Sequence, residues 1–189
     1  MKHLFISIFI ATIFPNASDA QMAPQDAWSQ PNDTLLSFTE TVHLDGMSKN
    51  ELFLRARDLL NSDFKELKIQ DKEAGEISAA GTTDATFDFR YIGKHNSVAT
   101  FEFVITFVVK DGAYRFTISN VRNSAINGTA ANGTFGILYK SNHSYTKQIL
   151  LSQSKLDAIY QSVKEGFTRE KNAIITFVEL NMQQPQTVL

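Results

Sequence analysis

Residues 98–119 read VATFEFVITFVVKDGAYRFTIS, and this stretch decides the fold. Large apolar side chains alternate with smaller or polar ones on both sides of Asp111-Gly112, which is the pattern of a β-hairpin closed by a two-residue turn. The Asp-Gly sequence predicts a type I′ turn, in which both turn residues have positive φ. The resulting register pairs Val109 with Tyr114, Phe107 with Phe116, and Ile105 with Ile118. We expect this face of the hairpin to lie in the core.

The opposite face of the same hairpin carries smaller and more polar side chains. Its pairs are Thr106 with Thr117, Val104 with Ser119, and Val108 with Arg115. One face of an antiparallel sheet can remain in water while the other is packed. An arginine on such a face can recognise an acidic or polar partner through its planar fork of donors. The candidate binding residues are therefore Arg115, Thr117, Ser119 and Thr106.

Helices are predicted on both sides of this hairpin in the sequence. In the segment 47–52, MSKNEL, Ser48 can cap a first turn, Glu51 can return a hydrogen bond, and Met47 can pack on Leu52. Apolar residues then recur at helical spacing to about Asn61. The same spacing predicts a second, longer helix from Ser152 to about Glu179.

The remaining periodic segments read as strands. Alternating apolar residues predict strands at 36–44, 67–70, 77–81, 87–91 and 135–139. The segment from Ser124 to Lys147 is rich in Asn, Gly, Ser and Thr, which predicts a long connection. The order of elements predicts an α+β domain in two layers, an antiparallel sheet with both helices packed on one face.

The beginning of the chain has the pattern of a secretory signal peptide. Residues 1–20 combine Lys2, an apolar run over residues 4–14, and the small-residue ending Ser18-Asp19-Ala20. The apolar run is shorter than the roughly 20 residues that span a bilayer, so we predict cleavage after Ala20 and a periplasmic or secreted mature chain with no transmembrane segment. We expect a flexible lead at 21–33, a single domain at 34–181 and a frayed tail at 182–189.

Composition excludes several chemistries. The 189 residues contain 18 Lys and Arg against 20 Asp and Glu, so the chain lacks the basic field that drives nucleic-acid binding. The sequence has no cysteine, which excludes disulfides, thiolate nucleophiles and lipid attachment through a cysteine. No His-x-x-x-His pair or phosphate-binding glycine loop occurs, so we predict neither a metal nor a cofactor. An exported chain without cysteine suits a bacterial envelope.

Three segments carry a resemblance to a known family. They are 45–53 (DGMSKNELF, followed by Arg55-Ala56), 71–77 (DKEAGEI) and 110–115 (KDGAYR). Together they are similar to the exported bacterial DUF4468 family, which is described as having a TBP-like fold, over most of Phe38 to Val121. The resemblance implies a curved sheet backed by two helices in a protein of Bacteroidetes-type envelopes. It implies no activity, and the fold name refers to shape. The Asn- and Gly-rich segment from Ser124 to Lys147 departs from the pattern.

Two functions fit the sequence. The first is a non-catalytic envelope protein that contacts another protein, a peptide or a glycan through the open sheet face and the 124–147 segment. The second is a small periplasmic hydrolase with its site in the 124–147 segment around Tyr139 and His143, which requires a carboxylate within hydrogen-bond reach of His143.

Overall fold

The computed structural model describes residues 34–88, 96–127, 133–141 and 152–183. The expected signal peptide at 1–20 and lead at 21–33 lie outside the described residues. Along the chain the elements are β1 (Phe38–His43), α1 (Lys49–Asp63), β2 (Glu66–Asp71), β3 (Glu76–Asp88), β4 (Asn96–Lys110), β5 (Ala113–Asn127), β6 (Gly136–Ile137) and α2 (Gln153–Gln183).

The strands form one antiparallel sheet of six strands in the order β1-β5-β4-β3-β2. The short strand β6 pairs with Arg122 and Asn123 of β5, on the edge that β5 also offers to β1. Because β2 to β5 follow one another as neighbours, most of the sheet is built by pairing consecutive segments.

The β4–β5 hairpin has the predicted register. Val109 pairs with Tyr114, Phe107 with Phe116, and Ile105 with Ile118. Tyr114, Phe116 and Ile118 are all buried, as predicted. The predicted type I′ turn is wrong, because Gly112 has a φ of 70° while Asp111 does not have positive φ. The turn is fixed from outside instead: the Asp111 carboxylate accepts from the Lys49 amide at 2.7 Å, and the Gly112 amide donates to the Met47 carbonyl at 2.8 Å.

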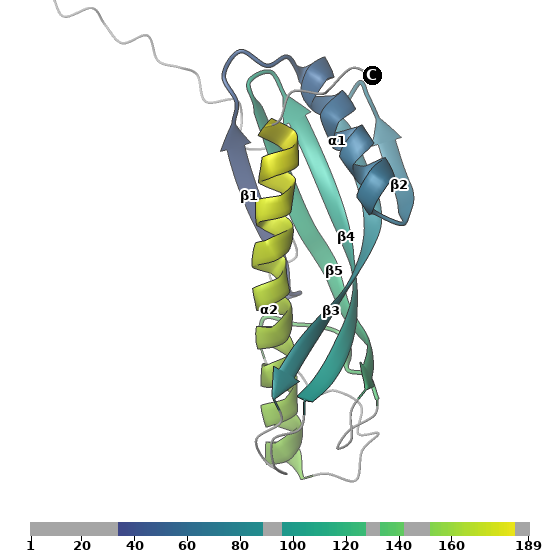
Figure 1. Ribbon diagram of the computed structural model, residues 1–189, viewed down its shortest axis with the longest axis vertical. Coiled ribbons are helices and arrows are strands. Elements are labelled where there is room, and N and C mark those ends of the chain that lie inside the picture. The colour runs from purple at the N-terminus through teal and green to yellow at the C-terminus, as the bar shows by residue number, and fades with distance from the viewer. Residues whose placement is uncertain (1–33, 89–95, 128–132, 142–151, 184–189) are drawn as a thin grey trace, which may run out of the picture. The chain divides into compact units, whose positions relative to one another are not determined.

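Both helices lie on the same face of the sheet, where the core is (Figure 1). From α1 the buried residues are Leu52, Phe53, Ala56, Leu59 and Leu60. From α2, Phe167 lies with its ring centroid 5.1 Å from that of Phe101 in β4. Each helix therefore packs its apolar stripe on the inward rings of the central strands. The predicted two-layer α+β architecture is confirmed.

The three segments that carry the family resemblance meet at one end of the sheet. The Ser48 hydroxyl caps α1 by accepting from the Glu51 amide at 3.2 Å, as predicted. The Glu51 carboxylate does not return a bond to Ser48; it pairs with Arg55 at 2.9 Å. The Lys49 ammonium donates to the Glu73 carbonyl in the β2–β3 turn. These polar contacts join the start of α1 to both neighbouring hairpin turns.

Several element boundaries differ from prediction. The segments predicted as strands at 77–81 and 87–91 belong to one strand as far as Asp88, because β4 supplies partners along the whole of β3. The strand β5 runs to Asn127, so the predicted connection from Ser124 begins as strand. The helices end at Asp63 and Gln183.

The predicted tail at 182–189 is wrong at its first residues. Met182 is fully buried, and its carbonyl accepts from the Arg55 guanidinium of α1 at 2.9 Å. This contact holds the last turn of α2 against α1. Residues 184–189 lie outside the described part of the chain.

Candidate functional site

The four candidate binding residues lie together on the sheet face opposite the helices. Thr106 pairs with Thr117, Arg115 lies opposite Val108, and Ser119 lies opposite Val104. Because side chains alternate along a strand, all of them point away from the buried rings of the same hairpin. Each is partly exposed, and neither α1 nor α2 covers this face (Figure 1).

A row of hydroxyl groups crosses this face. Thr39 of β1, Thr117 of β5 and Thr106 of β4 are consecutive partners across the sheet, and the row continues to Ser78 of β3. The Oγ1 atoms of Thr39 and Thr117 are 3.1 Å apart and form a hydrogen bond. Ser78 is buried, but the hydroxyls of Thr39, Thr117 and Thr106 belong to exposed or partly exposed residues, and a hydroxyl can both donate to and accept from a partner.

Arg115 is the cation beside this row. It lies between Thr41 of β1 and Val108 of β4. Partial burial lowers the pKa of its guanidinium from the ordinary value, because desolvation disfavours the charged form. A partly buried arginine loses less conformational freedom on binding than one that extends into water. Its planar fork of donors favours a planar acceptor such as a carboxylate or an amide.

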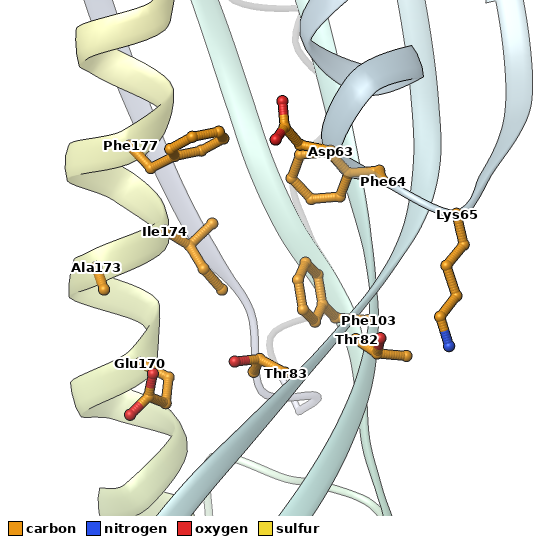
Figure 2. A pocket seen from close by; sticks show the side chains of 10 residues that line it. All are labelled: Asp63, Phe64, Lys65, Thr82, Thr83, Phe103, Glu170, Ala173, Ile174 and Phe177. Carbon is orange, nitrogen blue, oxygen red and sulfur yellow. The ribbon is translucent and has the colours of Figure 1, made fainter.

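A pocket that the sequence did not predict lies on the other face, between the two helices (Figure 2). Its volume is about 360 Å³, and its walls come from the end of α1, from β3 and β4, and from α2. Phe177 recurs at the helical spacing of the apolar residues of α2, yet 36% of this residue is exposed, and it lines the pocket. The sequence gives one indication of this pocket: the apolar stripe of α2 is longer than α1, so α1 cannot cover all of it.

The predicted 124–147 connection is anchored to the sheet by buried Asn123. The Asn123 amide nitrogen donates to the carbonyls of Thr100 and Ala125 at 3.1 and 2.8 Å, and its side-chain oxygen accepts from the Phe135 amide at 3.0 Å. Tyr139 is fixed as well, since its amide donates to the Tyr160 hydroxyl of α2 at 2.8 Å. Burial raises the pKa of Tyr160.

The catalytic alternative depends on a histidine that lies outside the described residues. His143 belongs to the undescribed segment 142–151, so the hydrolase hypothesis remains a prediction. Within the described ranges no three His, Asp or Glu side chains gather in a way that could hold a metal ion. Neither of the described helices combines the length and apolarity that crossing a bilayer requires.

The fold and these surfaces define a small two-layer α+β domain with an uncovered sheet face and a pocket between its helices. Residues 38–124 match the profile of the DUF4468 family, a domain of unknown function with TBP-like fold. The predicted resemblance is thereby confirmed over these residues. No curated protein matches the chain.

Two solved structures share the fold. One is a DUF4468 family protein from Bacteroides ovatus, with a TM-score of 0.52, 13% sequence identity, and coverage of 87% of this chain and 95% of the other. The second is a TBP-like protein from Parabacteroides distasonis, with a TM-score of 0.52, 13% identity, and coverage of 85% and 99%. At this identity the similarity shows the fold alone.

Proposed function

We propose that this protein is a non-catalytic, exported binding module of a bacterial envelope that contacts a protein, a peptide or a glycan through its open sheet face. The observation that carries the proposal is the register that aligns Thr39, Thr117 and Thr106 in one row beside Arg115. An open sheet face with a fixed spacing of donors and acceptors suits recognition of an extended polar chain.

The apolar neighbours of this row also support a binding role. Val104 and Val108 of β4 are partly exposed between the polar positions of the same face. Contact surfaces commonly combine apolar area with a few oriented polar groups, since burial of the former drives association and the latter select the partner. Gly136 and Ile137 of the 124–147 segment pair with β5 and add a second candidate contact region at the edge of the sheet.

Export rests on the signal-peptide pattern of residues 1–20. The similar structures come from Bacteroides ovatus and Parabacteroides distasonis, and they support the bacterial group of the proposal but not the location. N-terminal sequencing of the mature chain tests this part of the proposal, with Gln21 as the expected first residue.

Charge reversal on the open face tests the binding role. The mature protein is immobilised and incubated with the envelope fraction of its own bacterium and, separately, with a glycan array. We expect Arg115→Glu to lose the retained partner and to keep the Tm within a few degrees, because the residue lies outside the core. Arg57→Glu is the matched control, since it makes the same change of charge on α1, in the helical layer.

Retention of the same partners by Arg115→Glu and the unchanged protein would overturn the proposal. Loss of the partner in Arg57→Glu as well as Arg115→Glu would show a response to net charge and would also reject a specific contact at the sheet face.

A further inference from the structure

The two helices meet at one end and leave a pocket farther along. The Arg55 guanidinium of α1 reaches the Met182 carbonyl near the end of α2, so the helices are in contact there. The helix α1 ends at Asp63, and the chain then turns to the sheet, where the Lys65 amide donates to the Ala80 carbonyl at 3.0 Å. Beyond this point only α2 covers the inner face of β3 and β4, and the pocket of about 360 Å³ lies in the gap.

Half of the residues that line this pocket are aromatic or aliphatic, and the other half are polar or charged. Phe64 and Phe103 line the side of the sheet and α1, and Ile174 and Phe177 project from α2 toward them (Figure 2). The rings of Phe64 and Phe103 meet edge to face, with centroids 6.3 Å apart. These side chains leave an apolar surface open to a ligand, and pockets of a few hundred cubic ångströms with such walls are typical of small-molecule sites.

Gly81 of β3 lies against two of the rings that line the pocket. A Cβ atom at this position would lie 2.5 Å from the ring of Phe103 and 3.1 Å from Phe64. The absence of a side chain therefore lets both rings lie close to the strand, which deepens the space in front of them.

Three charged residues line the pocket, and two of them, Asp63 and Glu170, are acidic, whereas the third is Lys65. Asp63 and Glu170 carry their carboxylates at opposite ends of the pocket, whereas the Lys65 side chain points away from it (Figure 2). The cations next to Glu170 in sequence are engaged elsewhere: Arg169 donates to the Thr86 carbonyl at 2.8 Å, and the Lys171 ammonium lies 4.8 Å from the centroid of the Phe38 ring. In the described part of the chain, Glu170 has no ion pair.

We propose that this pocket binds a small organic cation, an amine attached to an apolar body. The apolar body would lie between Phe177 and the two rings on the sheet side, and the ammonium would approach Glu170 or Asp63. Aromatic ring faces also attract cations, which adds to the selectivity for positive charge. The Thr83 hydroxyl, which faces α2 in Figure 2, offers the ammonium a further acceptor. This site lies on the opposite side of the sheet from the proposed partner face and is independent of it.

Three probes of the same shape test the proposal: 4-phenylbutylamine, 4-phenylbutanol and 4-phenylbutanoate. Each is titrated into the ¹⁵N-labelled mature protein, and amide chemical shifts are followed by NMR. We expect the amine to bind about threefold or more tightly than the alcohol, as for a partly exposed ion pair, and the carboxylate to bind least. The shifted amides should be those of residues 63–65, 82–83 and 173–177.

Two variants and one control separate charge from shape. Glu170→Gln should reduce the preference for the amine over the alcohol and leave the affinity for the alcohol unchanged. Ile174→Trp should fill the cavity and abolish binding of all three probes, while the remaining amide spectrum reports an intact fold. Glu165→Gln, an exposed carboxylate of the same helix that does not line the pocket, should behave as the unchanged protein.

Equal affinity for the amine and the alcohol would overturn the assignment of a cationic ligand. Shifts located on the open sheet face, or no shifts at all, would overturn the pocket itself.

Discussion

At the scale of single residues, two buried tyrosines differ in one hydrogen bond. Tyr114 is fully buried, and among the described residues its hydroxyl has no partner. Tyr160 is almost as buried, but its hydroxyl accepts from the Tyr139 amide at 2.8 Å. A buried polar group without a partner costs free energy, whereas a paired one contributes to stability.

Removal of each hydroxyl should therefore have opposite effects. Tyr114→Phe should leave the free energy of unfolding unchanged or raise it by up to about 1 kcal/mol, since the ring contacts with Phe107 and Phe116 remain. Tyr160→Phe should lower it by about 1 kcal/mol. Urea denaturation at pH 7 measures both values on the same protein. A larger loss in Tyr114→Phe than in Tyr160→Phe would contradict this account.

The sequence predicts which side chains are buried better than it predicts what their polar atoms contact. Alternation alone places Tyr114 inward, because the period of a strand fixes the face of every residue. The partner of the Tyr160 hydroxyl is Tyr139, which lies 21 residues away in an Asn- and Gly-rich segment. A contact between residues so far apart in the sequence cannot be predicted from a local pattern. For the same reason Arg115 could be placed on the open face while Phe177 could not be placed at a pocket.

At the scale of elements, the start of α1 is held by two side chains from different parts of the chain. Ser48 accepts from the Glu51 amide, and Asp111, from the β4–β5 turn, accepts from the Lys49 amide. Ser48→Ala and Asp111→Ala should each lower the free energy of unfolding by about 1 kcal/mol, because each leaves a helix-end donor without its partner. Denaturant titrations of both variants measure the losses.

The matched control for these caps is at the other end of the helix. Ser62→Ala removes a hydroxyl that contacts the Leu59 carbonyl and should change stability by less than about 0.5 kcal/mol, since the residue is exposed. If Ser48→Ala were as mild as Ser62→Ala, the cap would not stabilise α1.

Elements that are specified by neighbouring residues could be predicted from the sequence, whereas irregularities in strand pairing could not. The cap of α1 and the β4–β5 register follow from residues within a few positions of one another. The register shift opposite Glu102 and Val104, where Asn120 has a φ of 51°, has no such signal. The irregularities in this part of β5 accompany the burial of Asn123 rather than an apolar residue, so a strict alternation read from the sequence fails beyond Ser119.

At the scale of the whole molecule, the pocket follows from the difference in helix length, and the open face follows from the packing of both helices on one side of the sheet. The 31 residues of α2 extend past the end of the 15-residue α1, so part of the inner face has one covering helix instead of two. The outer face has no helix in the described part of the chain. Sequence periodicity predicts each helix, but the gap depends on where α1 turns into β2, which only the packed arrangement fixes.

The stability of the fold should decline in alkaline solution for a specific reason. Burial raises the pKa of Tyr114, with a further contribution from the charge of Glu179, and burial also raises the pKa of Tyr160. Below about pH 10 both phenols are protonated in the folded and the unfolded chain, and their contribution is complete. Above that pH the unfolded chain releases these protons while the folded chain retains them, so the free energy of unfolding falls.

Above pH 10, each of the two tyrosines should lower the free energy of unfolding by up to about 1.4 kcal/mol per pH unit. Urea denaturation between pH 8 and pH 11.5 should therefore show a steeper decline above pH 10 in the unchanged protein than in Tyr114→Phe. Comparing the two curves removes the titration of lysines and of the other tyrosines, which both proteins share. Parallel curves above pH 10 would mean that the Tyr114 hydroxyl reaches solvent in the folded state, and the core beneath the two helices would then be less closed than the structure shows.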